Sequence, residues 1–222
     1  MPTIKPRPLT TTSFALLGQL ATRPWSAYEL NTQMQRSNLR YLWPRTASRV
    51  YQEVKNLAAH RLVTATPDQR NGRRRTVYAI TDAGRTTLEE WLRKPAGGLV
   101  LQHETLLKLI YANLAGTHEL RTLIAATATD ATAHAQALTE RYLDVHERGS
   151  QFPERAHLNA LAYEWFARVL EATAEWADWA NEAVDKWPTA TTDDGQHQWT
   201  QSTYEHAADR LAVLAHVGDT RS

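Results

Sequence analysis

Residues 43–57 read WPRTASRVYQEVKNL, a proline break followed by an amphipathic segment. Pro44 disfavours helix at Trp43, and Thr46 is a suitable N-cap because its hydroxyl can accept a hydrogen bond from the first helical turn. A helix is expected over residues 47–60, and its apolar side comprises Val50, Val54, Leu57 and Ala58. The polar side chains expected to lie largely away from that side are Arg45, Ser48, Arg49, Gln52, Lys55 and Asn56. The segment therefore predicts a helix that buries one side and exposes a basic one.

Two helices are expected before this segment. Residues 13–21 carry apolar side chains at helical spacing. Ser26 and Glu29 form a capping box, because the Ser26 hydroxyl can accept from the Glu29 N–H while the Glu29 carboxylate reaches back. A second helix is expected from there toward Arg36. Three helices thus follow one another before residue 61.

A short β-hairpin is expected next. Residues 62–66 and 76–80 each favour a strand, and Asn71-Gly72 between them is a strong turn signal, since both residues tolerate positive φ. The connection carries four arginines, Arg70, Arg73, Arg74 and Arg75. Side chains alternate along a strand, so the last three are not expected to touch one surface together. A fourth helix is expected from Thr81 or Asp82 through Trp91. Three helices and an arginine-tipped hairpin are the order of a winged helix-turn-helix.

The charge of the chain is divided unevenly. Residues 1–95 hold 16 Lys and Arg against 6 Asp and Glu, a net charge of +10, whereas residues 96–222 have a net charge of −9. This asymmetry points to a polyanion partner for the first half alone, although a merely solvated basic surface is the alternative. The hinge is expected near Lys94-Pro95-Ala96-Gly97-Gly98. We therefore expect a domain over residues 1–95 and a second over residues 96–222.

The second half is expected to be helical over residues 99–115, 117–148, 153–187 and 199–217. In the third of these helices an apolar stripe alternates at three- and four-residue spacing, as in a coiled-coil seam, and it comprises Trp165, Val169, Ala172, Trp176, Trp179, Ala183 and Trp187. The expected fold class is mainly α with a small β-hairpin, in which the helical second half forms a dimerisation domain. Residues after Pro188 are expected to be a dimer arm or a frayed end.

Several classes of protein are excluded or disfavoured. The chain has no cysteine, which removes disulfides, Cys-ligated zinc and a Cys nucleophile and fits the cytoplasm. No apolar run is long enough to span a membrane, and residues 1–12 lack the apolar core of a signal peptide. His118-Glu119 does not continue into a zinc-protease motif, because Thr122 stands where His is needed. Asp193, Asp194 and His197 read as a polar linker rather than a metal site. Neither catalysis nor a cofactor is expected.

The first half resembles the PadR family of regulators. Residues 43–57 look like that family's recognition helix, Tyr28-Glu29-Leu30 like its second helix, and residues 71–85 (NGRRRTVYAITDAGR) like its wing and the following helix. The likeness covers about residues 10–95, is weaker over residues 163–179, and finds no counterpart after Pro188. It implies a homodimer that binds an inverted repeat in double-stranded DNA, usually as a repressor.

The resemblance also implies which residues face DNA, namely Thr46, Ser48, Arg49, Tyr51 and Lys55. By their chemistry, Ser48 and Arg49 are the best candidates for base edges, because arginine can bind guanine bidentately. Tyr51 and Lys55 more plausibly bind phosphate, and Tyr51 alternatively covers the edge of the core. The full predicted set adds Arg45, Gln52, Arg70, Arg73, Arg74 and Arg75.

Five of the eight tryptophans lie in the second half. Trp165, Trp176 and Trp179 are expected either to form core and dimer seam or to line a pocket for an aromatic effector, and Trp91 near the hinge is an alternative pocket wall. Two other functions compete with that of a sequence-specific regulator: a winged-helix protein-interaction module, and an architectural protein that binds DNA without sequence preference.

Overall fold

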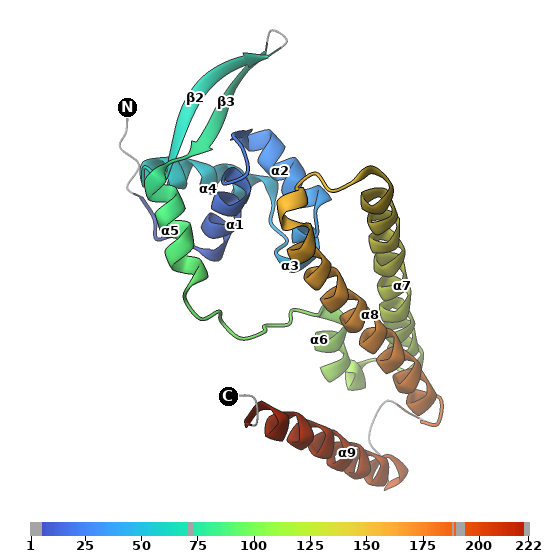
Figure 1. Cartoon of the computed structure of the whole chain (residues 1–222). Coiled ribbons are helices and arrows are strands. Elements are labelled where there is room, and N and C mark those ends of the chain that lie inside the picture. The colour runs from blue at the N-terminus through green and yellow to red at the C-terminus, as the bar shows by residue number, and fades with distance from the viewer. Residues whose placement is uncertain (1–5, 71–72, 188, 190–193, 220–222) are drawn as a thin grey trace. The chain divides into compact units, whose positions relative to one another are not determined.

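The computed structural model describes residues 6–70, 73–187, 189 and 194–219. Contacts divide the chain into two compact units, Met1–Leu99 and Val100–Ser222. In Figure 1 the first unit runs from blue to green and the second from green to red. The described residues are mainly helical and contain one small antiparallel sheet, so the predicted fold class is confirmed.

The first unit combines five helices with a three-stranded sheet of order β1-β3-β2 among its described residues. The elements are α1 (Thr11–Leu20), β1 (Trp25–Ser26), α2 (Ala27–Arg36), α3 (Leu39–Leu42), α4 (Ala47–Ala59), β2 (Val63–Arg70), β3 (Arg73–Ile80) and α5 (Asp82–Leu92). The sequence did not predict β1 and α3, because two and four residues are too short to carry a periodic pattern. β1 exists through tertiary pairing, in which Trp25 lies opposite Tyr78 and Ser26 opposite Val77.

The helix ends follow the predicted capping residues. The Ser26 hydroxyl accepts from the Glu29 N–H at 3.2 Å, and the Glu29 carboxylate accepts from the Ser26 N–H at 2.8 Å, so the predicted capping box is confirmed. Thr46 caps α4, as predicted. At the other end of α4, Arg61 has a positive φ of 59°, and the Leu62 N–H donates to the Leu57 carbonyl at 3.1 Å. This is a Schellman ending with arginine where glycine is usual.

The core of the first unit lies where α1 packs against α4 and α5, and α2 against α4. Its fully buried side chains are Leu16, Leu17, Leu20, Leu30, Met34, Val50, Val54 and Leu57. The start of α5 sits very close to β2: a Cβ added to Gly84 would lie 2.2 Å from the Leu62 carbonyl oxygen. Only glycine fits this approach, which fixes α5 to the base of the hairpin.

The β2–β3 hairpin extends away from the helices (Figure 1) and is longer than predicted. Antiparallel pairing runs from Val63 opposite Ile80 to Arg70 opposite Arg73. The outer half consists of polar residues whose strand propensity is low, so composition limited the prediction to residues 62–66 and 76–80. The predicted Asn71-Gly72 turn lies outside the described residues.

The second unit contains α6 (Glu104–Ile110), α7 (Thr117–Arg148), α8 (Ala156–Val184) and α9 (Asp194–Asp219), with 3-10 turns at Ala112–Leu114 and Pro153–Arg155. α7 and α8 lie side by side and antiparallel (Figure 1). A helix was wrongly expected from residue 99. α6 instead begins at Glu104, where the His103 ring accepts from the Leu106 N–H at 3.4 Å. No helix among the described residues is both long and apolar enough to cross a membrane.

Only some residues of the predicted apolar stripe of α8 belong to the core of the second unit. Its buried cluster is made of Ala112, Leu120, Ile124, Ala177, Ala180 and Val184, and Trp176 and Trp187 pack against it. Four other members of the stripe are exposed instead: Trp165, Val169, Ala172 and Trp179. One side of α8 therefore carries large apolar residues that the described part of this unit leaves uncovered.

Candidate nucleic-acid interface

Helix α4 separates an apolar side from a polar side, as its sequence predicts. Val50, Val54 and Leu57 are fully buried against α1 and α2. The exposed side chains on the opposite side are those of Thr46, Ser48, Tyr51, Gln52 and Lys55. One prediction for this helix is wrong: Asn56 is only 4% exposed and belongs to the interior. Its amide has partners there that the helical pattern cannot reveal.

The N-terminus of α4 gathers hydroxyl groups. The Thr46 Oγ1 accepts from the Arg49 N–H at 3.4 Å and lies 3.1 Å from the Ser48 Oγ. Unpaired N–H groups at a helix N-terminus favour an anion. This end of α4 is therefore suited to a phosphate or the electronegative edge of a base.

Arg45 is held in place by a buried hydroxyl of α1. Its Nε donates to the Thr12 Oγ1 at 3.2 Å, and the Trp43 Nε1 donates to the same oxygen at 3.0 Å. The Arg45 guanidinium also lies over the Trp43 ring, 4.3 Å from its centroid. Thr12 and Trp43 were not among the predicted site residues, because a contact across more than thirty residues leaves no mark in local spacing. They fix the position of Arg45 beside the start of α4.

Arg49 lies next to a buried carboxylate. Its Nη2 is 3.8 Å from the Glu53 Oε2, and the Glu53 side chain is only 1% exposed. Glu53 Oε1 accepts a hydrogen bond from the Ser13 hydroxyl and another from the Asn56 Nδ2 at 3.3 Å. A buried carboxylate is tolerable only when such partners satisfy it. Glu53 thus anchors α4 to α1 and restrains Arg49 at once.

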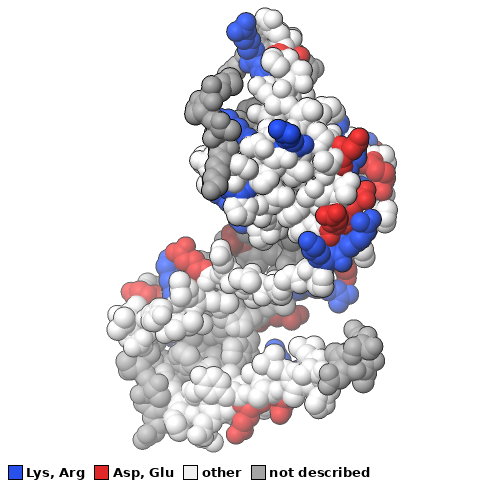
Figure 2. Space-filling model, turned by 90° about the vertical axis from the view of Figure 1, so that its left-hand side faces the viewer, with Lys and Arg blue, Asp and Glu red and all other residues white. Residues whose placement is uncertain are grey.

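The arginines of the hairpin differ in their surroundings. Arg75 Nε donates to the Asp68 carboxylate across the strands at 2.6 Å, and its Nη1 lies 3.4 Å from the Glu29 carboxylate of α2. Arg74 is exposed on the other face of β3, as strand alternation predicts. The side chains of Arg70 and Arg73 lie outside the described residues. On the face drawn in Figure 2, basic atoms occupy the far end of the hairpin.

Glu29 joins Arg75 of the hairpin to the start of α2. Burial raises the pKa of its carboxyl group, but hydrogen bonds from the Ser26 N–H and hydroxyl and the charges of Arg75 and Arg23 outweigh burial, so that the pKa lies below its ordinary value. Glu29 therefore stays ionised at neutral pH and holds the outer part of the hairpin, at Arg75, against α2.

The four predicted tryptophans do not share one environment. Trp91 belongs to the first unit, where it stacks on Phe14 at a ring distance of 4.8 Å. In the second unit Trp176 packs against the core, Trp165 lies edge-on to Phe166, and Trp179 stacks on Trp199 at 5.9 Å.

Metal-binding clusters of three or more His, Asp or Glu side chains are absent from the part of the chain that the structure describes. Of the candidate ligands named from the sequence, Asp193 lies outside that part, as does the side chain of Asp194.

Comparison with known proteins finds relatives of the first unit. Residues 16–90 match the model of the transcriptional regulator PadR-like family. The probable transcriptional regulator Rv1176c of Mycobacterium tuberculosis is 34% identical over 82 residues, and this match covers 36% of the present chain and 43% of that protein. The chain thus spans less than half the length of this curated relative.

Solved structures extend the likeness in fold to both units. The PadR-like regulator BC1756 from Bacillus cereus has a TM-score of 0.64 at 16% identity, covering 78% of this chain and 98% of that one. Bacillus subtilis PadR in complex with operator DNA has a TM-score of 0.63 at 19% identity, covering 79% and 98%. These likenesses confirm the winged-helix fold with C-terminal helices.

The family model spans α4, the hairpin and most of α5, the elements on which the resemblance was first seen. The family is one of transcriptional regulators, not of enzymes. Residues 16–90, which lie within the first unit, are therefore similar to the PadR-like family of transcriptional regulators.

Proposed function

We propose that the protein is a homodimeric, sequence-specific regulator that binds an inverted repeat in double-stranded DNA and acts in the cytoplasm as a repressor. The observation that carries this proposal is the exposed polar side of α4, which lies on a helix whose other side is fully buried. A helix of about 10–12 Å diameter fits the major groove of B-DNA. The core then holds α4 rigidly while its polar side meets the bases.

The proposal assigns roles along α4 and the hairpin. Ser48 and Arg49 read base edges, whereas Tyr51 and Lys55 bind phosphate. Arg45, Thr46 and Gln52 contact the same region of the DNA strand, near the start of α4. The hairpin supplies further phosphate contacts through Arg70, Arg73 and Arg74, while Arg75 can contribute only by sharing its charge with Asp68 and Glu29.

Dimerisation is assigned to the second unit. Four of the large apolar residues that α8 exposes recur at spacings of three and four, and they are Leu158, Leu161, Trp165 and Val169. Exposed apolar stripes of this kind mark interfaces. α9 exposes Tyr204, Leu211, Val213 and Leu214, which favours the dimer-arm interpretation of the residues after Pro188 over a frayed end. A two-fold dimer would present two copies of α4 to the two halves of an inverted repeat.

A response to an aromatic small molecule completes the proposal. Bacillus subtilis PadR has also been solved in complex with p-coumaric acid, with a TM-score of 0.63 at 20% identity to this chain. The exposed Trp179, which lies outside the proposed dimer interface, is the aromatic surface that such a molecule would contact. A ligand acts only through different affinities for the DNA-binding and non-binding arrangements. Release of DNA on addition of an aromatic acid would support this part of the proposal.

The first test is fluorescence anisotropy with the DNA upstream of the protein's own gene and a scrambled duplex, at two salt concentrations. Preferential binding to the upstream duplex that weakens with salt is the expected result. Equal binding to both would favour an architectural protein, and binding to neither at low salt would favour a protein-interaction module. A reporter fused to the bound region then gives the sign of regulation.

A further inference from the structure

The segment before α1 is bound to α4 through its main chain. The Arg7 N–H donates to the Asn56 Oδ1 at 2.9 Å, and the Arg7 carbonyl accepts from the Asn56 Nδ2 at 3.2 Å. A ring nitrogen of His60 lies 2.7 Å from the same carbonyl oxygen. The buried amide of Asn56 thus holds the backbone of Arg7 by both of its ends.

The local sequence prepares this attachment. Arg7 stands between Pro6 and Pro8. Proline fixes its own φ and pushes the residue before it toward an extended conformation. The segment around Arg7, which we call the arm (residues 6–10), therefore loses little conformational freedom when it binds along α4.

The attachment places two arginines on one carboxylate. Arg7 Nη2 lies 4.0 Å from the Glu53 Oε2, and Arg49 Nη2 lies 3.8 Å from the same oxygen. Their side chains are 51% and 39% exposed, whereas that of Glu53 is 1% exposed. One carboxylate can balance only one of two guanidinium groups, so a positive charge is left over at the surface.

This excess charge borders the polar side of α4. Residues 49, 53, 56 and 60 follow one another at spacings of four, three and four, so they form one edge of the helix. Residues 48, 52 and 55 form the adjacent exposed row. The arm therefore runs beside the row that the proposed function turns toward DNA.

We propose that Arg7 is a DNA phosphate contact, supplied by the arm rather than by the recognition helix or the hairpin, and that Asn56 and Glu53 are the residues that position it. This inference rests on the proposed function. A long, flexible guanidinium that is half exposed suits a phosphate, which fixes orientation without reading sequence. Arg7 was not among the predicted DNA-binding residues, because prolines on both sides leave it outside any periodic pattern.

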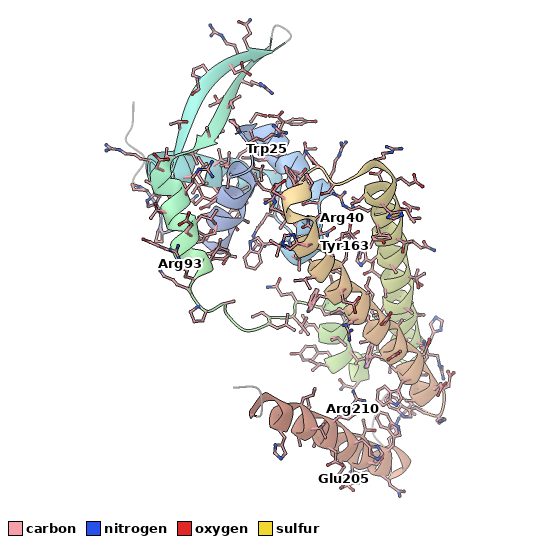
Figure 3. All side chains as sticks on the ribbon, viewed as in Figure 1. Trp25, Arg40, Arg93, Tyr163, Glu205 and Arg210 are labelled. Carbon is pink, nitrogen blue, oxygen red and sulfur yellow. The ribbon has the colours of Figure 1, made fainter. Side chains whose placement is uncertain are left out.

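The test is the salt dependence of binding of Arg7→Ala in the full-length protein, with Arg93→Ala as the matched control. Arg93 is 71% exposed and pairs with Glu89 at the end of α5 remote from the hairpin (Figure 3). Loss of one phosphate contact makes the slope of log K against log salt less steep by about 0.9, which corresponds to a roughly eightfold loss of DNA affinity at 0.1 M salt. The loss is expected to be equal for the cognate and scrambled duplexes, and Arg7→Lys should restore the slope. Arg93→Ala should keep the wild-type slope.

The outcomes separate the inference from the proposed function. The main-chain bonds to Asn56 do not use the Arg7 side chain, and its half-exposed pair with Glu53 is long, at 4.0 Å, so the melting temperature of Arg7→Ala should stay close to that of the wild type. If the wild type binds DNA and Arg7→Ala keeps its slope, the arm contact does not exist. A loss confined to the cognate duplex would make Arg7 a base contact and overturn the phosphate assignment. If the wild type binds neither duplex, the proposed function itself fails.

Discussion

The Nη2 of Arg49 lies 3.8 Å from the carboxylate of Glu53, one turn further along α4. Glu53 is buried and Arg49 is partly exposed, so the arginine side chain contacts the buried carboxylate while part of it remains accessible at the surface. This pairing restricts the rotamers of a side chain that otherwise loses up to about 2 kcal/mol of conformational entropy when fixed. Under the proposed function, this restraint would prepare Arg49 for the bidentate base contact assigned to it.

Arg49→Ala tests base reading by that contact. We expect affinity for the cognate duplex to fall by about 1–3 kcal/mol, while affinity for scrambled DNA falls far less. Anisotropy titrations at one fixed salt concentration measure both. Lys55→Ala is the matched control on the same helix, and it should weaken both duplexes alike. Equal losses for Arg49→Ala would remove its base-reading role.

Gly84→Ala should destabilise the first unit strongly. The added Cβ would lie 2.2 Å from the Leu62 carbonyl oxygen and 2.8 Å from the Ile80 Cγ1, so α5 must shift. We expect a loss of about 1–3 kcal/mol in the free energy of unfolding, measured by urea denaturation. Gly18→Ala in α1 is the control, because a Cβ there meets nothing within 4 Å. It should stabilise by roughly 0.5–1 kcal/mol, and a similar effect at both sites would contradict the close approach.

Glu29→Gln should reveal a stability term that depends on pH. The pKa of Glu29 is lowered in the folded protein from its ordinary 4.5. Its carboxylate therefore stabilises the fold above pH 4.5, and the contribution disappears as the pH falls through the folded pKa. The wild type should exceed Glu29→Gln in unfolding free energy at pH 7, and the difference should shrink toward pH 3. In a Ser26→Ala background the difference should be smaller at every pH. A constant difference would assign the effect to packing.

Leu161→Glu should convert a dimer into a monomer. Leu161 is 71% exposed in the single chain and belongs to the exposed apolar stripe of α8 that comprises Leu158, Leu161, Trp165 and Val169. A carboxylate placed in a dimer seam is desolvated without a partner and opposes association. Sedimentation velocity at micromolar concentration measures the change. Ala167→Glu adds the same charge to an exposed position outside that stripe and should leave the mass unchanged. A wild-type protein that sediments as a monomer would refute the seam.

Local chemistry explains why much of the fold was predictable. The Ser26–Glu29 capping box and the Thr46 cap are satisfied within three residues, and the apolar spacing of Val50, Val54 and Leu57 is a property of one helix. β1, the burial of Asn56 and the attachment of Arg45 to Thr12 all depend on residues more than thirty positions apart. No local pattern records such contacts.

The candidate site was predictable to a similar degree. Exposure of Ser48, Gln52 and Lys55 follows from helical periodicity, and the structure bears it out. The surroundings of Arg75 do not follow, because its partner Glu29 lies on a different helix. Their roles toward DNA remain predictions. Exposure can be derived from period and composition, whereas ion pairing across elements requires the tertiary fold.

The bridge from Asp68 through Arg75 to Glu29 has a consequence for the DNA as well as for the protein. It joins β2, β3 and α2 in the outer part of the hairpin, while the close approach at Gly84 fixes the base of the hairpin to α5. If the protein binds DNA as proposed, the protein fixes the distance between its helix contacts and its hairpin contacts, and a bound duplex has to fit that distance. We expect operators to be selected partly by how easily the base steps that the protein does not contact can deform. The rigid hairpin would then contribute to sequence preference through DNA stiffness rather than through base contacts.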